Sequence, residues 1–417
     1  MTPKKYTLTS LIVWVAALGY FVDIFDLLLF GMIRTASLKD IGITAKEDIE
    51  RIGLMLDNWQ MTGMLVGGIF WGILGDKKGR LSVLFGSILT YSVANIGNGF
   101  VHSVSLYGAL RFLAGFGLAG ELGAGVTLVN ELLDKQKRGL GTALVAGTGI
   151  LGAVVGGFVV KALGVDHWRT CYFIGGGMGI ALLLLRIGIM ESGMFEAIKH
   201  ANVQKGNLWV ILKDKQRRIK YLAVILVAIP LWYVVQLFAK YSPELADGMG
   251  LHFPDAVRKT VPVNTIMLTY FGLTLGDFAC GIISQKLKSR KKAMWLFIIA
   301  SIITICIFFL VGAQSETLFY TGICIIGFMV GYWAVFMSVA AESFGTNIRS
   351  TVTNTAPNFV RGSVVLINIF YEFFKYQLHF NSVKANIAVG IMSFAAAIWA
   401  LSRLEETFGK DLDYIEA

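Results

Sequence analysis

The sequence predicts an all-α membrane protein in which twelve transmembrane helices form two six-helix bundles. The chain of 417 residues is 55% hydrophobic and only 15% charged, whereas a soluble domain carries about 25% charged residues. Apolar runs close to the length of about 20 residues that a membrane helix needs follow one another along the chain. Basic residues gather in every second connection between these runs, which is the bias that orients membrane helices. A water-soluble globule is therefore excluded.

The short turn at residues 72–80 fixes the orientation of the predicted helices. It joins two apolar runs and carries three basic residues and one acid. Because Lys and Arg resist translocation, such a turn belongs on the cytoplasmic side. Later even-numbered connections are basic as well, whereas the connections at 34–57 and 242–262 mix both signs and are expected outside.

The apolar runs predict twelve spans, and the alternation of their connections places both termini in the cytoplasm. Gly-rich segments within the runs allow the close helix approach on which packing in a membrane depends. The predicted spans are residues 8–33, 59–75, 81–100, 105–132, 139–163, 168–190, 221–241, 264–287, 293–312, 318–342, 350–375 and 385–404.

An internal repeat divides the chain into two halves. Glu131 and Arg138 stand seven residues apart at the end of one predicted span and the start of the next, and Glu342 and Arg349 repeat this spacing in the second half. Parallel repeats of this kind place a binding site between the halves, near the membrane midplane. We expect an N-terminal bundle at 1–190, a cytoplasmic loop at 191–220, a C-terminal bundle at 221–404 and a cytoplasmic tail at 405–417.

Several other classes of function are not indicated. The net charge of +10 comes from basic residues in short loops beside apolar runs, which is typical of orientation signals facing anionic lipid rather than of nucleic-acid binding. The four cysteines lie within apolar runs without metal-ligand spacing, so neither a disulfide framework nor a metal site is predicted. The five histidines are scattered and form no H-E-x-x-H motif. We expect no enzyme, no cofactor and no cleaved signal peptide.

Three motifs of the first half resemble the major facilitator superfamily of secondary transporters. The pattern G-x-x-x-D-K-x-G-R at residues 72–80 is similar to the loop between helices 2 and 3 of that superfamily. R-x-x-x-G at 111–115 is similar to its helix 4, and residues 131–139 resemble its E-x(6)-R-G element. The resemblance implies two six-helix bundles that rock around a central site, and it implies a part for Arg111 in proton transfer.

Further patterns resemble the metabolite:proton symporter branch of this superfamily. They are Phe25-Asp26 followed by L-F-G at 29–31, E-L-G at 121–123, and E-S-G-M-F at 191–195. The tail at 405–412 is similar to the P-E-T-K-G tail of sugar and organic-ion porters, although its Pro and Lys are missing.

Six charged residues at predicted cytoplasmic helix ends are expected, from the resemblance, to form an inner gate. Charge pairs at such a surface can form in the outward-open state and separate in the inward-open state. The alternative is that these charges only set the topology. The residues are Asp76, Arg80, Glu131, Arg138, Glu342 and Arg349.

Asp23 and Asp26 are the first candidates for proton coupling. They stand three residues apart in the first predicted span and so share one helix face. An ionised side chain at membrane depth costs about 3 kcal/mol, so it persists only when paired, hydrated or used. Close carboxyl groups in an apolar surrounding favour the protonated form, which allows them to carry a proton. We favour Asp26, which matches the branch pattern; the alternative is a structural contact with an Arg or a hydroxyl group.

Arg111 and Glu121 complete the proton-coupling candidates. At about 100° per residue, ten residues place their side chains about 80° to 90° apart on one helix. They therefore cannot pair with each other, and each is expected to face another helix or the cavity. Protonating a carboxylate partner would free an Arg to hold an anion, whereas the alternative is a static ion pair between helices.

Arg361 is expected to bind the charge of the solute. It is the only cation predicted deep in the second half, and it shares a helix face with Asn358, which suits a carboxylate. Arg111 and Arg361, one in each half, could hold an anion from both sides together with Asp26; the alternative is again an ion pair. Uncharged residues expected to line the site are Gln60, Trp232, Tyr233, Gln236 and Tyr332.

The sequence thus predicts a proton-coupled secondary transporter that imports a small organic anion, such as a carboxylate metabolite, by alternating access. Its expected partners are this solute, protons and the lipid bilayer. We expect a multi-pass monomer in the cell membrane, which is the inner membrane in a Gram-negative cell. An exporter or antiporter, or a carrier of a neutral or cationic solute on the same fold, is the alternative; a membrane-embedded enzyme and a receptor are further ones. Asp26→Asn is expected to abolish proton-driven uptake while sparing exchange.

Overall fold

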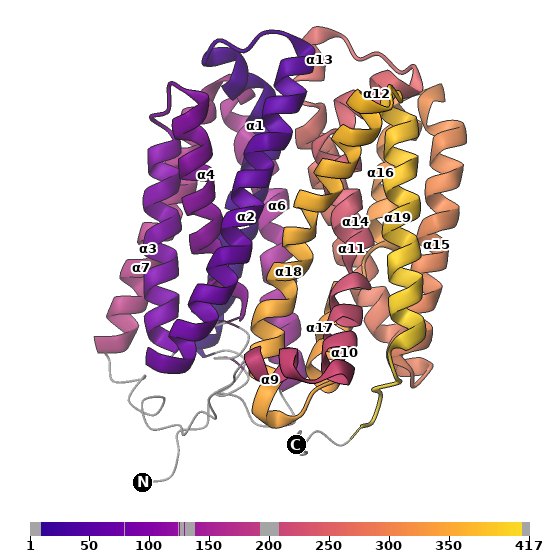
Figure 1. The fold of residues 1–417 in the computed structure, drawn as a ribbon. Helices are drawn as coiled ribbons and strands as arrows, with labels where there is room; N and C mark the ends of the chain where they lie inside the picture. Colours follow the sequence, from indigo (N-terminus) through magenta and orange to yellow (C-terminus); the bar gives the residue numbers. More distant parts are fainter. Residues whose placement is uncertain are drawn as a thin grey trace.

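The chain is helical throughout the part that the structure describes. Its helices run side by side, those of the first half in one group and those of the second half in another (Figure 1). The end that carries α12 (Ser242–Met249) and α13 (Asp255–Arg258) is named the α12–α13 end, and the opposite end, which carries α9 (Leu208–Lys213), is named the α9 end. The computed structural model describes residues 10–78, 80–123, 125, 129, 138–191 and 208–410.

In the first half, α1 packs against α6 and α7, while α2 and α3 both pack against α4. The predicted span 105–132 is interrupted, because α4 ends at Leu118 and a turn at Ala119 and Gly120 precedes the next helical residues. The elements are α1 (Leu11–Asp40), α2 (Lys46–Lys78), α3 (Arg80–Asn98), α4 (Val104–Leu118), α6 (Arg138–Leu163), η1 (Val165–His167) and α7 (Trp168–Glu191).

In the second half, the predicted span 221–241 is divided. Pro230 has no N–H to donate to the preceding turn, and the helix breaks just before it into α10, α11 and the π-helix η2. The remaining elements are α10 (Lys215–Leu226), α11 (Ile229–Tyr233), η2 (Val234–Lys240), α14 (Val261–Lys286), α15 (Arg290–Val311), η3 (Gly312–Gln314), α16 (Glu316–Met329), α17 (Trp333–Glu342), α18 (Thr346–Glu372), η4 (Phe373–Gln377) and α19 (Ser382–Arg403).

Seven helical stretches of the described part are long and apolar enough to cross a membrane. Each coincides with a predicted span, and the full number of twelve stays a prediction. Large apolar side chains face outward from these helices, for example Leu310 and Ile391, as lipid contact would require. The stretches are Val13–Asp40, Val165–Ile187, Lys215–Lys240, Val261–Lys286, Arg290–Gln314, Glu316–Glu342 and Ser382–Arg403.

The helices at the α12–α13 end are longer than the hydropathy of the sequence predicts. The connection expected at residues 34–57 is mostly helical, since α1 continues to Asp40 and α2 begins at Lys46. Glu47 and Asp48 lie in the first turn of α2, where negative side chains stabilise a helix N-terminus. Asp57, expected in a loop, therefore lies well inside α2.

Among the described helices, three pairs make the most extensive contacts between the two halves. α14 packs against both α1 and α6, and α18 packs against α2. Within the second half, α14 and α16 cross closely at Gly272, where an added Cβ would lie 2.1 Å from the carbonyl oxygen of Cys324. Glycine thus permits this backbone contact.

We expect Gly272→Ala to destabilise the protein by about 1–3 kcal/mol, as overpacking a close contact does. Gly281→Ala is the matched control on the same helix, because nothing lies within 4 Å of its added Cβ, and it is expected to be neutral or stabilising. Thermal unfolding of both variants in detergent measures the difference. Equal unfolding midpoints would show that α14 and α16 can move apart to admit the added methyl group without a loss of stability.

Candidate functional site

A buried ion pair joins the two halves near the middle of the helices. Arg361 on α18 donates from Nη2 to Oδ2 of Asp23 on α1, at 3.1 Å, and both side chains are fully buried. The same nitrogen lies 3.4 Å from the hydroxyl of Tyr20. The pair therefore connects the first half to the second through one carboxylate and one guanidinium.

Arg361 keeps donors that the described residues do not use. Its Nε and Nη1 are buried without a hydrogen-bond partner, as is Oδ1 of Asp23. The guanidinium carbon lies 5.8 Å from the ring centre of Trp232 on α11 and 5.7 Å from that of Tyr20. A guanidinium with two open donors beside aromatic rings is suited to take a carboxylate in a bidentate manner.

Asp26 lies deeper in the first half than Asp23. Its Oδ1 lies against Gly175 of α7, where an added Cβ would approach to 2.1 Å. Asp26 has no ion-pair partner among the described residues, and both of its carboxylate oxygens are buried without a hydrogen bond there. The structure thus directs Asp23 toward the second half and Asp26 toward α7.

Glu121 lies beside Arg186 of α7, which the sequence analysis did not single out. Arg186 donates to both carboxylate oxygens, at 3.1 and 2.8 Å, and to the carbonyl oxygen of Leu84. Ser87 on α3 donates to Glu121 as well, at 2.8 Å. All of these partners belong to the first half, so the contacts of Glu121 are those of a static pair within that half, and its predicted part in proton coupling stays a prediction.

We expect Arg186→Met to destabilise the protein by about 3–5 kcal/mol, because it leaves a buried carboxylate without its cation. Replacing both partners, as Glu121→Leu with Arg186→Met, is expected to restore part of this loss. Arg169→Met is the matched control on α7, since Arg169 pairs with Asp40 at a half-exposed position, where such pairs contribute about 0–1 kcal/mol. Thermal unfolding in detergent measures all three, and a neutral Arg186→Met would argue against a static pair.

Asp57 on α2 is the centre of a second buried cluster toward the α12–α13 end. It accepts from Arg111 of α4 at 3.3 Å and from Lys240 of η2 at 3.0 Å. Gln236 and Tyr241 donate to its other oxygen, at 3.1 and 3.2 Å. The expectation that Arg361 is the only deep cation of the second half is therefore wrong, because Lys240 is fully buried too.

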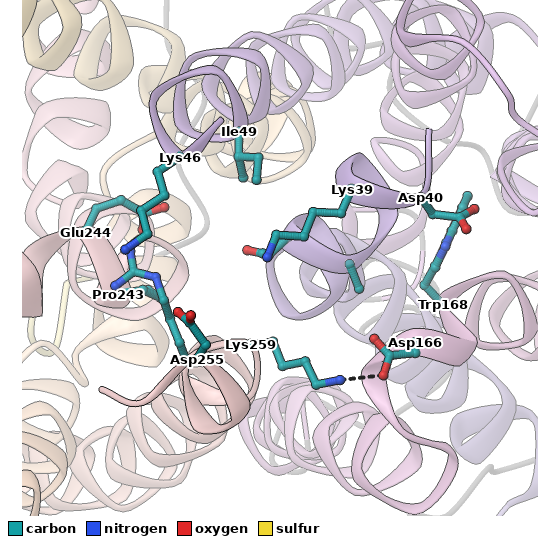
Figure 2. A pocket seen from close by; sticks show the side chains of 13 residues that line it. Lys39, Asp40, Lys46, Ile49, Asp166, Trp168, Pro243, Glu244, Asp255 and Lys259 are labelled. Atoms are coloured by element: carbon teal, nitrogen blue, oxygen red, sulfur yellow. Dashed lines mark hydrogen bonds and ion pairs between the residues drawn. The ribbon is translucent and has the colours of Figure 1, made fainter. Parts of the chain in front are cut away.

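Further polar contacts close the α12–α13 end between the halves. Arg34 donates to Glu244 at 2.5 Å and lies over the ring of Tyr241, with 3.8 Å from its guanidinium carbon to the ring centre. Lys375 donates to both oxygens of Glu50, each at 2.6 Å. Near them lies a cavity of about 370 Å³, lined by residues of α1, α2, η1, α7, α12 and α13. Lys259 pairs with Asp166 across this cavity (Figure 2).

The remaining predicted site residues divide into two groups. Asn358 donates to the carbonyl oxygen of Ala119 across the halves, at 2.9 Å, and Gln60 accepts from Arg111 at 2.5 Å. In contrast, Tyr233 donates to Asn386 and Tyr332 donates to the carbonyl oxygen of Val227, both within the second half. The first group, with Gln236 and Trp232, lies near the ionic clusters; the second group stabilises its own half.

The predicted inner gate lies partly outside the described residues. Glu131 is not described, and neither are the side chains of Asp76, Arg80 and Arg138. These four stay predictions.

The second-half members of this gate lie at the α9 end. Glu342 accepts from Arg290, at 3.3 Å, and from Thr407, at 2.7 Å. Arg349 donates to the carbonyl oxygens of Ala341 and Phe344. Beside them, burial of Glu406 acts to raise its pKa, but the Ser289 hydroxyl and backbone N–H groups outweigh burial and hold that pKa below its ordinary value.

Sequence reasoning missed Asp57, Lys240, Arg34 and Arg186. Asp57 and Arg34 fell in a stretch interpreted as an outside loop, and Lys240 and Arg186 lie near predicted span ends, where basic residues usually mark the flank of a span. The sequence did contain one indication of Lys240: it follows Gln236 by four residues, so both lie on the same face of one helix. No group of His, Cys, Asp and Glu that could hold a metal ion occurs among the described residues.

Comparisons with known proteins agree on the family and fold. The family model described as Major Facilitator Superfamily matches residues 16–363. A protein named "Probable 4-methylmuconolactone transporter" from Cupriavidus pinatubonensis is 25% identical, over 96% of this chain and 92% of its own length. The niacin transporter of Acinetobacter baylyi is 26% identical, over 97% and 95%. The crystal structure of a D-xylose-proton symporter matches with a TM-score of 0.70 at 16% identity, over 96% and 99% of the two chains.

Proposed function

The chain belongs to the major facilitator superfamily and is a transporter rather than an enzyme, and from this premise we propose that it imports a small organic anion together with protons. We propose twelve membrane spans in two six-helix bundles, with both termini in the cytoplasm and the α12–α13 end outside. The bundles would rock around a central site, in the cell membrane of a bacterium or a comparable membrane.

The Asp23–Arg361 pair is the observation that supports this proposal most. A carboxylate that is protonated releases its guanidinium, and a released guanidinium with open donors takes up an anion. Because Asp23 and Arg361 come from different halves, this exchange would be coupled to the relative position of the halves. Asp26, three residues further along the same helix, would be a second place for the proton.

The names of the relatives support an organic acid as cargo. Niacin is a carboxylic acid, and 4-methylmuconolactone carries a carboxyl group beside its lactone ring. Both relatives align over nearly the whole chain. A substrate of this class would place its carboxylate on Arg361 and its planar body near the ring of Trp232.

Transport in proteoliposomes tests this proposal. The purified chain would be reconstituted and given an inward proton gradient, with nicotinate, nicotinamide, 4-methylmuconolactone and D-xylose offered separately. We expect accumulation of at least one of the carboxylates, and its loss when an uncoupler collapses the gradient. Accumulation of only neutral solutes, or carboxylate efflux driven by the same gradient, would contradict the proposed cargo or direction.

A further inference from the structure

The carboxylate of Asp57 lies in a set of four donors that together suit any carboxylate. Arg111 and Lys240 donate to Oδ1, and Gln236 and Tyr241 donate to Oδ2. The exposed fraction of the Asp57 side chain is 1% and that of Lys240 is 0%. Each oxygen accepts from two donors, and both donors to Oδ1 are cations, which suits a buried carboxylate. We name these four donors the Asp57 cradle.

The cradle is assembled from both halves of the chain. Asp57 and Arg111 belong to the first half, whereas Gln236, Lys240 and Tyr241 follow one another along η2 and its C-terminal end. In a π-helix the turn closes between residues five apart, so residues four and five apart lie over one another. The π-helix therefore turns three donors of the second half toward one point.

The first half is shaped to admit these donors. An added Cβ at Gly31 of α1 would lie 2.8 Å from Cγ of Lys240, and one at Gly53 of α2 would lie 3.0 Å from the hydroxyl of Tyr241. The absence of side chains at these two positions lets Lys240 and Tyr241 reach across the interface. The two halves are therefore closely packed where Lys240 and Tyr241 reach Asp57.

The charges of the cradle do not balance. Arg111 and Lys240 supply two positive charges, and Asp57 supplies one negative charge, while the neighbouring Arg34 is matched by Glu244. If the halves separate at the α12–α13 end, as the proposed rocking requires, Asp57 would stay with Arg111 on the first half. Lys240, Gln236 and Tyr241 would then move with the second half, and Lys240 would no longer have an anion beside it.

We propose that Lys240, Gln236 and Tyr241 form a carboxylate-binding site on the second half, and that Asp57 is its internal occupant while the α12–α13 end is closed. A solute carboxylate arriving from that end would bind these three donors before α2 returns. This inference rests on the proposed function, since it requires an anionic solute, and it adds the residues that would capture the solute first.

A continuous line of contacts leads from the surface to this site. The cavity of Figure 2 is lined by Glu244, which pairs with Arg34. Arg34 lies over the ring of Tyr241, whose hydroxyl donates to Asp57. An anion entering this cavity meets the basic side chains that line it, Lys39, Lys46, Arg258 and Lys259. The buried Arg34 lies between them and the cradle, and a cationic solute would be repelled by Arg111 and Lys240.

Binding of acetate to Asp57→Ala tests the inference without knowledge of the natural solute. The full-length variant, purified in detergent, loses the internal occupant but keeps all four donors. We expect acetate to raise its thermal unfolding midpoint in a saturable manner, by about 3 °C or more well above half-saturation. Acetamide, and chloride at the same ionic strength, are expected to have no effect. The wild-type protein, whose cradle is filled by Asp57, is expected to respond much less than Asp57→Ala, since acetate is then left with open donors elsewhere, such as those of Arg361.

Two further variants make the result specific. Adding Lys240→Gln to Asp57→Ala is expected to reduce the acetate response to the wild-type level. Asp40→Ala is the matched control, because Asp40 is a half-exposed carboxylate near the same end whose partner is Arg169. Asp57→Ser takes the place of Asp57→Ala if the latter does not yield folded protein. The inference would be overturned if neither Asp57 variant responds to acetate, if the wild type responds equally, or if Lys240→Gln leaves the response of Asp57→Ala undiminished.

This outcome is separable from that of the transport assay. An acetate response in Asp57→Ala without carboxylate transport by the wild type would leave the site standing and remove the proposed cargo. Carboxylate transport by the wild type without an acetate response would keep the proposed function and remove this site.

Discussion

Arg361→Ala is expected to weaken nicotinate binding by about 100-fold or more, because charge-assisted hydrogen bonds contribute about 1.5–3 kcal/mol each and 1.4 kcal/mol is tenfold in affinity. Nicotinamide, the neutral analogue, is expected to lose much less. The reason is that Arg361 is the buried cation with open donors beside the aromatic rings of Tyr20 and Trp232. Half-saturation concentrations from counterflow in proteoliposomes, or from thermal shift, measure both ligands; if neither binds, the carboxylate found in the transport assay and its amide replace them.

The controls separate binding from folding. Arg361→Lys keeps the charge but loses the planar fork, and is expected to fall between wild type and Arg361→Ala. Because Arg361→Ala leaves Asp23 without its cation, the double variant Asp23→Asn with Arg361→Ala shows how much of the effect comes from that carboxylate. Equal losses for the acid and its amide would mean that Arg361 only holds the halves together.

Asp23→Asn is expected to abolish accumulation driven by a proton gradient while exchange of solute across the membrane continues. Asn cannot carry the proton but still accepts a hydrogen bond from Arg361. For one proton per solute, one pH unit supports about tenfold accumulation, since it is worth about 1.4 kcal/mol. The variant is expected to reach only the equilibrium distribution, measured by uptake of labelled solute under an imposed gradient.

Asp26→Asn is the informative comparison, because the sequence favours Asp26 whereas the contacts across the interface belong to Asp23. If both variants lose accumulation, the two carboxyl groups act together. If only Asp26→Asn does, the proton is carried within the first half, away from Arg361. Normal accumulation in both variants would remove both carboxyl groups from the coupling mechanism.

The helical architecture was predictable because membrane spans depend on composition and length, which are local properties of the sequence. Helix ends were less predictable. The first connection was expected to be long, yet α1 and α2 continue through its charged residues, because contacts with the second half, such as Glu50 with Lys375, stabilise helix where hydropathy alone predicts loop. Likewise, an apolar sequence does not show that a turn at Ala119 exposes a carbonyl oxygen to Asn358.

The candidate residues were predictable in kind but not in their pairing. Rare charges within apolar runs singled out Asp23, Arg361 and Glu121, since each is costly unless used or paired. Which charged residues form pairs depends on how helices far apart in the sequence pack. This packing placed Arg186 beside Glu121 and Asp57 beside Arg111. Asp57 and Lys240 escaped notice because charges near span ends are common and carry little information on their own.

The contacts that close the α12–α13 end differ in how far water reaches them, and this difference has a consequence for ionic strength. The Lys259–Asp166 pair is 39% and 66% exposed, whereas the Lys240–Asp57 pair is 0% and 1% exposed. Mobile ions screen exposed charges over a Debye length of about 8 Å at physiological salt but act little on dry ones. Raising the salt concentration is therefore expected to weaken the exposed Lys259–Asp166 pair and to leave the buried Lys240–Asp57 pair unchanged. The salt dependence of opening at the α12–α13 end would then report on the exposed pair alone.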